Sequence, residues 1–402
     1  MEGIVRQIFH NCMSLNESKI PFCKNMNRQT IMYQNNLSGK KIAIFCPSLS
    51  DGGVQRVASL LSKIYHEFGC DVHVITLYDK INYPFKGSYF TLTFADFSLF
   101  NLFKNTNSFL SLRNYMKKND FDLIIDLRSR MRLIPELIVY LFAIPLKKTI
   151  FTYHLPLITH YIPKPLFISR FFYNKAFANV AVSNSIQKLL TANKINKTSV
   201  IHNPIDMDFI ESKSLEELDF SFDYIIGSGR MNDNIKQFDH LISAYCKSSL
   251  PNENIHLILL GDGKIRPDLK SKIENKFKSK IHFIGFVENP FKYYSNAKFF
   301  VLSSKYEGFP MVLIEALACG SPLVSYDCQT GPSEIIKHNH NGILVYPNSI
   351  VKLSKAIDKM YLDKEFYENC KNKAKSSVNH LDVKTIKNEW QKFTLRLQND
   401  KV

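Results

Sequence analysis

The chain has 402 residues, too many for one ordinary hydrophobic core, so its length favours two domains. Its formal net charge is +16, from 52 basic and 36 acidic residues, which indicates an anionic partner such as a nucleotide, a nucleic acid or a membrane surface. The eight cysteines form no C-x-x-C pair and no Cys/His cluster of the zinc type, so we predict free thiols and no zinc site.

Residues 1–38 are polar and without clear periodicity, and we interpret them as an N-terminal extension. They lack the basic start and long apolar region of a signal peptide. The most apolar stretch, LIPELIVYLFAIPL at 133–146, is shorter than the roughly 20 residues of a membrane span and contains Pro135 and Glu136. We therefore expect a soluble or peripheral protein of the cytoplasm.

A first series of strand and helix patterns fills residues 39–204. KIAIFCP at 41–47 is a buried-strand pattern. Apolar residues then recur at helical spacing from Val54 to Phe68, and Gly69 is placed to end the helix. Further short apolar strands follow between loops and helices: VHVITLY, FDLIIDL, KTIFTYH, NVAVS and SVIHN.

The alternation restarts after Pro204. Helices such as FDHLISAYC and MVLIEALAC separate the strands DYIIGSG, IHLILLG, IHFIG, KFFVLSS, PLVSYD and GILVYP. The boundary segment ESKSLEELDFS resembles a linker or a surface segment. Two successive series predict an α/β fold of two doubly wound, Rossmann-like domains, at 39–204 and 205–385. A C-terminal helix at 386–402 follows, with its return to the first domain left open.

The stretch KYEGFPMVLIEALACGSPLV at 305–324 carries the main candidate site. The strand before it ends at Ser304, so Glu307 and Phe309 lie at the carboxyl end of a strand, where ligands bind in open α/β sheets. Pro310 suits the start of a helix. Glu307 alone would be an ordinary residue near a helix N-terminus, favoured by the helix dipole; the whole string favours a binding site.

Free backbone amides near Met311 and Val312 would face the crevice, and such a helix N-terminus is a ready phosphate site. Glu315 is three or four residues farther along, on the same helical face. A nucleoside diphosphate sugar matches this layout. We predict sugar hydroxyls near Glu307, the diphosphate at the amides and the ribose hydroxyls on Glu315.

Candidate partners of the diphosphate lie elsewhere in the chain. Arg230 and Lys236 follow strand DYIIGSG and offer a guanidinium fork and a point charge; taken alone, either would be interpreted as a surface cation. Gly52 and Gly53 leave backbone amides accessible at a helix start in the first domain. His154, at a strand end in TYHLPL, is a candidate for contacting the sugar or the acceptor, with a structural loop histidine as the alternative.

EGFPMVLIEALACGSPLV resembles the E-x7-E signature of the retaining glycosyltransferases of family 4, which have the GT-B fold. Further stretches agree in order, over roughly residues 40–385. DGGVQRVASLL resembles the family's first Gly-rich loop and helix, and GSGRMNDNIKQFDHLISAY resembles its G-R-x4-K-x4-L-I-x-A motif. GDG at 261–263 and DCQTGPSEII resemble two later segments. MNDN departs from the commoner, more basic sequence before Lys236.

The resemblance implies transfer of a sugar, as by a hexosyltransferase, from a nucleotide-sugar donor to an acceptor hydroxyl with retention of configuration. A UDP-sugar is the favoured donor, no further cofactor is implied, and the acceptor is a saccharide or lipid-linked saccharide. Bacterial lipopolysaccharide, O-antigen or other surface polysaccharide assembly is the implied setting. The implied catalytic residues are Glu307, His154, Arg230 and Lys236, and the implied donor-binding residues are Gly52, Gly53, Arg230, Lys236, Phe309, Met311, Val312 and Glu315.

Other functions stay open with less support. A sugar-nucleotide epimerase or hydrolase on the same scaffold is the main alternative, because fold does not fix function. A nucleic-acid partner is not expected, since no recognition motif accompanies the positive charge. Two D-x-D stretches, at 120–122 and 206–208, are interpreted as turn residues rather than metal sites.

One long segment lacks acidic residues. From Leu137 to Ile205 there is no Asp or Glu, while aromatic residues alternate with basic ones. A solvated basic surface is the usual explanation of such a pattern. We predict instead that the first domain docks to anionic lipid at the inner face of the cytoplasmic membrane. The basic residues concerned are Arg128, Arg130, Arg132, Lys147, Lys148, Lys164, Arg170, Lys175, Lys188, Lys194 and Lys197.

Overall fold

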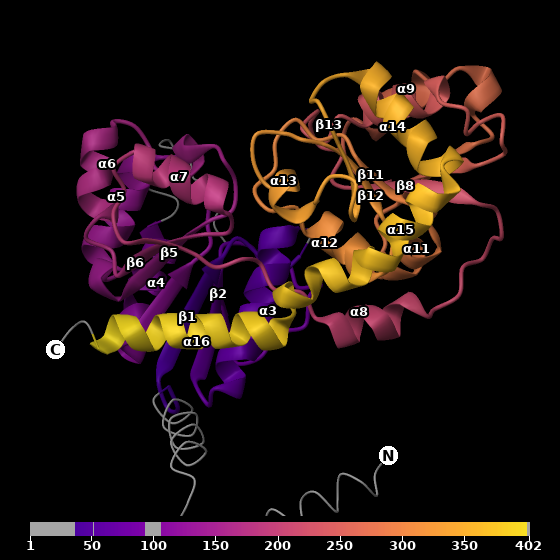
Figure 1. Cartoon of the computed structure of the whole chain (residues 1–402). Coiled ribbons are helices and arrows are strands. Elements are labelled where there is room, and N and C mark those ends of the chain that lie inside the picture. Colours follow the sequence, from indigo (N-terminus) through magenta and orange to yellow (C-terminus); the bar gives the residue numbers. More distant parts are fainter. Residues whose placement is uncertain (1–36, 51, 93–105, 400–402) are drawn as a thin grey trace, which may run out of the picture.

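The computed structural model describes residues 37–50, 52–92 and 106–399, which form two α/β domains beside each other (Figure 1). The predicted N-terminal extension lies almost entirely outside the described residues, as does Asp51 of the DGG stretch. Leu37, which the sequence assigned to the extension, is buried in the core of the first domain. Its carbonyl oxygen accepts a hydrogen bond from the thiol of Cys70, so the ordered first domain includes this residue.

The first domain is built on a seven-stranded parallel sheet of order β3-β2-β1-β4-β5-β6-β7. The central strands are rich in apolar side chains, which are buried on both faces of the sheet because helices cover both faces. The strands are β1 (Lys41–Cys46), β2 (Asp71–Thr76), β3 (Ser88–Thr91), β4 (Leu123–Asp126), β5 (Thr149–Tyr153), β6 (Ala178–Ala181) and β7 (Thr198–Val200). The helices are α3 (Gly53–Glu67), α4 (Thr106–Asn119), α5 (Leu133–Phe142), α6 (Leu166–Tyr173) and α7 (Asn184–Ala192).

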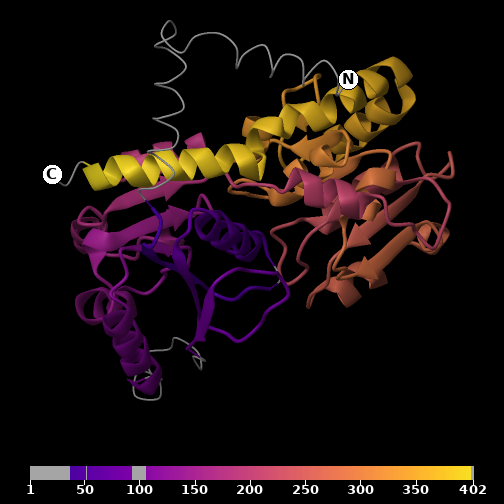
Figure 2. The same cartoon turned by 90° about the horizontal axis from the view of Figure 1, so that it is seen from below.

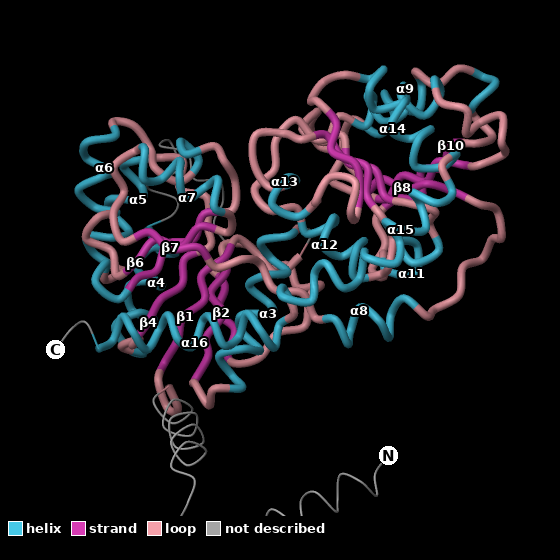
Figure 3. Tube along the Cα trace, viewed as in Figure 1, coloured by secondary structure: helices cyan, strands magenta, loops and turns pink. Residues whose placement is uncertain are grey.

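The second domain has a six-stranded parallel sheet of order β10-β9-β8-β11-β12-β13. Figure 3 shows helices around the strands of each domain. The strands are β8 (Tyr224–Ser228), β9 (His256–Leu260), β10 (Ile281–Gly285), β11 (Phe300–Leu302), β12 (Leu323–Tyr326) and β13 (Gly342–Val345). The helices are α8 (Met207–Ser214), α9 (Phe238–Lys247), α10 (Arg266–Ser271), α11 (Phe291–Asn296), α12 (Met311–Ala318), α13 (Pro332–Ile335), α14 (Ile350–Leu362) and α15 (Lys364–Ala374).

These two doubly wound sheets confirm the predicted fold class. Each sheet reverses its strand order once, between β1 and β4 in the first domain and between β8 and β11 in the second. Loops at the carboxyl ends of such neighbouring strands diverge and leave room for a ligand. The sequence missed β3, and the segment interpreted as a linker begins inside α8.

The chain crosses between the domains twice, and the two crossings are hydrogen-bonded to each other. The amide of Ile205 donates to the carbonyl of Leu381 (3.0 Å), and the amide of Val383 donates to the carbonyl of Ile205 (2.7 Å). The last helix, α16 (Val383–Asn399), then lies along the first domain (Figure 2). It starts three residues before the predicted position. The ring of Trp390 lies 6.4 Å from that of Tyr65 in α3.

The cysteines of the described residues form no disulfide. These six are free thiols, as predicted: Cys46, Cys70, Cys246, Cys319, Cys328 and Cys370. No helix within the described ranges combines the length and the apolarity needed to cross a bilayer.

Candidate active site

Glu307 is held at the point where the second sheet reverses its strand order. It lies in the loop after β11, and Lys236 lies in the loop after the neighbouring strand β8. Oε1 of Glu307 accepts from Nζ of Lys236 (2.5 Å) and from Oγ of Ser304 (2.6 Å). The Glu307 side chain is 10% exposed and that of Lys236 is 21% exposed. The predicted catalytic carboxylate is therefore paired with, and held in place by, a predicted diphosphate-binding lysine.

Gly308 brings this loop into contact with the first domain. A Cβ atom at this position would lie 1.8 Å from the carbonyl oxygen of His154, at the end of β5. Only glycine permits that approach of two backbones. The next residue, Phe309, is buried, and its ring lies 4.9 Å from that of His202. The predicted loop thus packs directly on the first domain.

The N-terminus of α12 faces the start of α3 across the domain boundary. Pro310, predicted to begin the helix, occupies the N-cap position, and the helix begins one residue later at Met311. A Cβ atom on Gly53 would lie 3.1 Å from Cγ of Met311. The first amides of a helix lack acceptors within the helix, so those of Met311 and the half-buried Val312 are suited to an anion.

Glu315 is buried in α12, and its partner comes from the other domain. Its Oε1 accepts from Nη1 of Arg56 in α3. The guanidinium of Arg56 also lies 5.1 Å from the centre of the Tyr83 ring. Burial acts against the charge of Arg56, but the charge and hydrogen bond of Glu315, together with Tyr83 and Tyr294, more than offset it and raise the pKa of the guanidinium. The carboxylate keeps Oε2 as a second acceptor.

A pocket of about 370 Å³ lies between the domains at this ion pair. Arg56 and Tyr83 line it from the first domain, and Phe286, Met311 and Glu315 line it from the second. Its volume is in the range of small-molecule binding sites. The pocket combines aromatic walls with the carboxylate of Glu315, which suits a ligand with a flat ring and hydroxyl groups.

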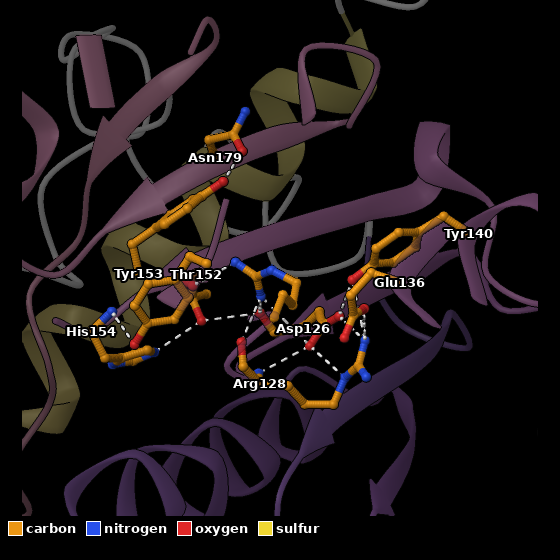
Figure 4. A network of polar contacts seen from close by, with 10 residues as sticks. Asp126, Arg128, Glu136, Tyr140, Thr152, Tyr153, His154 and Asn179 are labelled. Carbon is orange, nitrogen blue, oxygen red and sulfur yellow. Dashed lines mark hydrogen bonds and ion pairs between the residues drawn. The ribbon is translucent and has the colours of Figure 1, made fainter. Parts of the chain in front are cut away.

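His154 lies at the domain boundary, but its ring turns toward the first domain's core (Figure 4). The Thr152 hydroxyl donates to the carbonyl of Asp126 (3.2 Å), so it accepts from His154 Nε2–H (2.9 Å). Nδ1 is buried and has no hydrogen-bond partner among the described residues. Burial, aided by the positive charge of Arg130, lowers the pKa of His154 to about 3. His154 is therefore a neutral imidazole at neutral pH.

A buried charge network lies behind His154, at the end of β4. Nε and Nη2 of Arg128 donate to both carboxylate oxygens of Asp126, at 3.0 and 2.8 Å, and Nη2 also donates to Glu136 at 3.2 Å (Figure 4). Arg130 is buried among aromatic rings, with that of Phe151 4.7 Å away. The interpretation of Arg128 and Arg130 as part of a basic surface is wrong, because internal carboxylates and rings satisfy both.

The remaining predicted residues contribute less to the contacts of this structure. Arg230 follows β8 at the same sheet edge and is exposed, where its charge acts on the nearby Tyr306 hydroxyl. Gly52 is the N-cap residue of α3, and its backbone hydrogen-bonds the Tyr83 hydroxyl. The backbone of Gly52, predicted to bind the ligand, is therefore hydrogen-bonded to Tyr83 in this structure.

Glu334 is a cross-domain residue that the sequence showed only as part of the GPSEII stretch. Its carboxylate accepts from the amides of Asn184 (2.7 Å) and Ser185 (2.8 Å), at the start of α7 in the first domain. Burial would raise the pKa of Glu334, but His202, whose Nε2 lies 3.9 Å away, and the hydrogen bonds from these first-domain groups lower it to about 2. An acid two residues after the Gly331-Pro332 pair was the available signal. The signal for Arg56 was a cation in the first turn of a helix, where the helix dipole disfavours a positive charge.

The sequence matches agree with this geometry. Residues 51–209 match the family model described as Glycosyltransferase Family 4, and residues 213–377 match the one described as Glycosyl transferases group 1. The chain belongs to these glycosyltransferase families. The family 4 match ends and the group 1 match begins near the first crossing between the domains. Together they contain every residue predicted for the site.

One curated relative is similar to half of the chain. The N-acetylgalactosamine-N,N'-diacetylbacillosaminyl-diphospho-undecaprenol 4-alpha-N-acetylgalactosaminyltransferase of Campylobacter jejuni is 31% identical over 200 residues, which are 50% of this chain and 54% of the relative. The chain thus spans about half the length of the curated relatives it matches, or less.

Solved structures of glycosyltransferases share the fold over most of the chain. A glycosyltransferase from Rickettsia africae has a TM-score of 0.71 at 18% identity, covering 89% of this chain and 99% of its own. Alr3699/HepE from Anabaena, in complex with UDP and glucose, has a TM-score of 0.72 at 18% identity, covering 89% and 100%. At this identity the likeness concerns the fold, and it confirms the predicted GT-B arrangement.

Proposed function

We propose that the chain is a retaining glycosyltransferase that moves a sugar from a nucleotide-sugar donor to an acceptor hydroxyl. One observation carries the proposal. The Lys236–Glu307 pair and the N-terminus of α12 lie where two loops of the second sheet diverge, next to a pocket that Arg56 and Glu315 close from both domains. This arrangement offers cations, helix amides and carboxylates to a diphosphate, a sugar and a ribose.

In the proposed reaction the bond between the anomeric carbon and the phosphate oxygen breaks, and its electron pair leaves with the nucleoside diphosphate. The acceptor oxygen forms the new bond, and its proton passes to the departing phosphate oxygen. Lys236, Arg230 and the amides of α12 stabilise the negative charge on that diphosphate. Glu307 orients the sugar hydroxyls through Oε2, while Lys236 and Ser304 hold Oε1.

The other site residues have supporting roles. Glu315 accepts from the ribose hydroxyls through Oε2 while Arg56 holds Oε1. Gly53 keeps α3 close to the diphosphate, since a side chain there would meet Met311. His154 contributes its backbone carbonyl to the close packing of Gly308, while its buried ring stays with the first domain's core.

The donor and acceptor are proposed from the relatives. A UDP-sugar is the proposed donor, since one solved structure with this fold holds UDP and glucose. A lipid-linked saccharide is the proposed acceptor, since the Campylobacter relative is named for a diphospho-undecaprenol substrate. We accordingly propose a role in bacterial lipopolysaccharide, O-antigen or other surface polysaccharide assembly, at the inner face of the cytoplasmic membrane.

Binding and product analysis test this proposal. Labelled UDP-, GDP- and ADP-sugars are screened for binding to the full chain, and the best donor is then incubated with lipid-linked and free saccharides. The expected result is a new glycosidic bond with the donor's anomeric configuration. Conversion or hydrolysis of the donor at the same rate without an acceptor would refute transfer and favour an epimerase or hydrolase.

A further inference from the structure

An unusual number of large apolar side chains lie exposed in one part of the first domain. Six such residues, on or just before α5 and α6, are between 52% and 71% exposed: Met131, Ile134, Leu141, Phe142, Phe167 and Phe171. The other exposed large hydrophobics of the described residues are spread over both domains. A local concentration of this kind marks an interaction surface.

The two helices present these residues on one side of the molecule. α5 follows β4 and α6 follows β5, and the strands β4, β5 and β6 are consecutive neighbours. Right-handed crossovers then place both helices on the same face of the sheet, where Figure 1 shows them beside each other. Their inner sides pack through Tyr140 and Tyr173, with ring centres 6.4 Å apart. The exposed residues therefore lie on the outer sides.

The charge of this surface has one sign. Exposed cations stand at the ends of the helices: Arg132 before α5, Lys164 before α6 and Lys175 after it. Nζ of Lys175 lies 3.7 Å from the centre of the Phe171 ring. The one acidic residue of α5, Glu136, is buried and bonded to Arg128, and no acid follows before Asp206. The surface therefore consists of exposed apolar side chains with cations at its border.

We propose that this outer side of α5 and α6, the first-domain lipid surface, docks onto an anionic bilayer. Phe167, Phe171 and Leu141 would enter the interface, and the cations would lie at the lipid phosphates. Charge complementarity favours anionic lipid over a protein or a second copy, because no acid is exposed on the two helices to pair with a basic partner. The use of this docking rests in part on the proposed function, since a lipid-linked acceptor would lie in the same bilayer.

Vesicle flotation tests the surface with the full chain. Vesicles of phosphatidylglycerol and phosphatidylcholine should carry the protein upward at low salt, and vesicles of phosphatidylcholine alone should carry at least tenfold less. Phe167→Ser with Phe171→Ser, and separately Lys164→Glu with Lys175→Glu, should each lower binding at least tenfold while the melting temperature stays unchanged. Leu362→Ser and Lys276→Glu, exposed positions of the second domain, are the matched controls and should bind normally.

A fluorescence measurement locates the contact. When anionic vesicles are added, the fluorescence emission of the Phe167→Trp variant should shift to shorter wavelengths. Brominated lipid should quench it, as expected for a ring within the acyl region. The proposal would be overturned by equal binding to neutral vesicles or by no binding at low salt. It would also be overturned if the chain formed a dimer without lipid and the Phe167→Ser, Phe171→Ser variant were monomeric. Transfer to a lipid-linked saccharide made water-soluble by a short lipid chain is measured separately, without vesicles; its absence would count against the proposed function and leave the lipid surface intact.

Discussion

Replacing Glu334 with Gln tests whether one carboxylate holds the two domains together. Glu334 of the second domain accepts hydrogen bonds at 2.7 and 2.8 Å from two amides at the start of α7, and a third at 3.0 Å from Nδ2 of Asn184. Glutamine keeps one carbonyl acceptor but loses the charge and the second acceptor. Hydrogen bonds to charged groups contribute about 1.5–3 kcal/mol, so the open-to-closed ratio should rise roughly 10- to 150-fold.

Small-angle X-ray scattering measures the outcome. At pH 7 the Glu334→Gln variant should have a larger radius of gyration than the parent, and Glu253→Gln, an exposed second-domain control, should not. The pKa of Glu334 lies at about 2, below its ordinary value of 4.5. Its stabilising contribution is therefore constant from pH 8 to 5 and is lost as pH falls from about 4.5 toward 2. An unchanged radius in the variant, or parental opening between pH 8 and 5 that the variant lacks, would refute the reasoning.

Three further predictions concern the proposed reaction. Glu315→Ala should raise the Kd for UDP roughly 10- to 150-fold in calorimetry, because it removes a charged acceptor; an unchanged Kd would contradict the ribose role. Glu307→Ala should lower kcat far more than it weakens UDP binding, whereas equal losses would place it at the diphosphate. Activity should survive EDTA, because Lys236 and Arg230 supply the positive charge and the described part of the chain holds no group of three His, Cys, Asp or Glu suited to a metal. Loss on chelation that Mg²⁺ or Mn²⁺ restores would revive the D-x-D stretches.

The fold could be predicted well from the sequence because each buried parallel strand is a short run of apolar residues. It missed β3 (Ser88–Thr91), whose last three residues are only half-buried, and the polar α8. Such elements are stabilised by their neighbours rather than by their own pattern. Local patterns therefore located the sheets but not every element at their margins.

The sequence offered candidate site residues one by one, without the pairs that they form and without Arg56. Glu315 and Arg56 are 259 positions apart, so nothing local indicates that they meet. Arg128 was placed on the surface because a charge count along the chain does not show which side chains point inward. Its partner Asp126 lies two positions away, at the end of a strand whose other residues are apolar. A carboxylate in that position is the sign of an internal ion pair.

The return of α16 to the first domain affects the order in which the chain can fold. Ile386, Trp390 and Leu395 belong to the same buried cluster as the first domain's α3 and β1. A ribosome releases the first domain's strands early but this helix only after the whole second domain. The Tyr65 side of α3 therefore stays uncovered for most of synthesis, when exposed apolar surface favours aggregation. A chain that stops before Val383 would keep that surface exposed permanently, although both sheets would be complete.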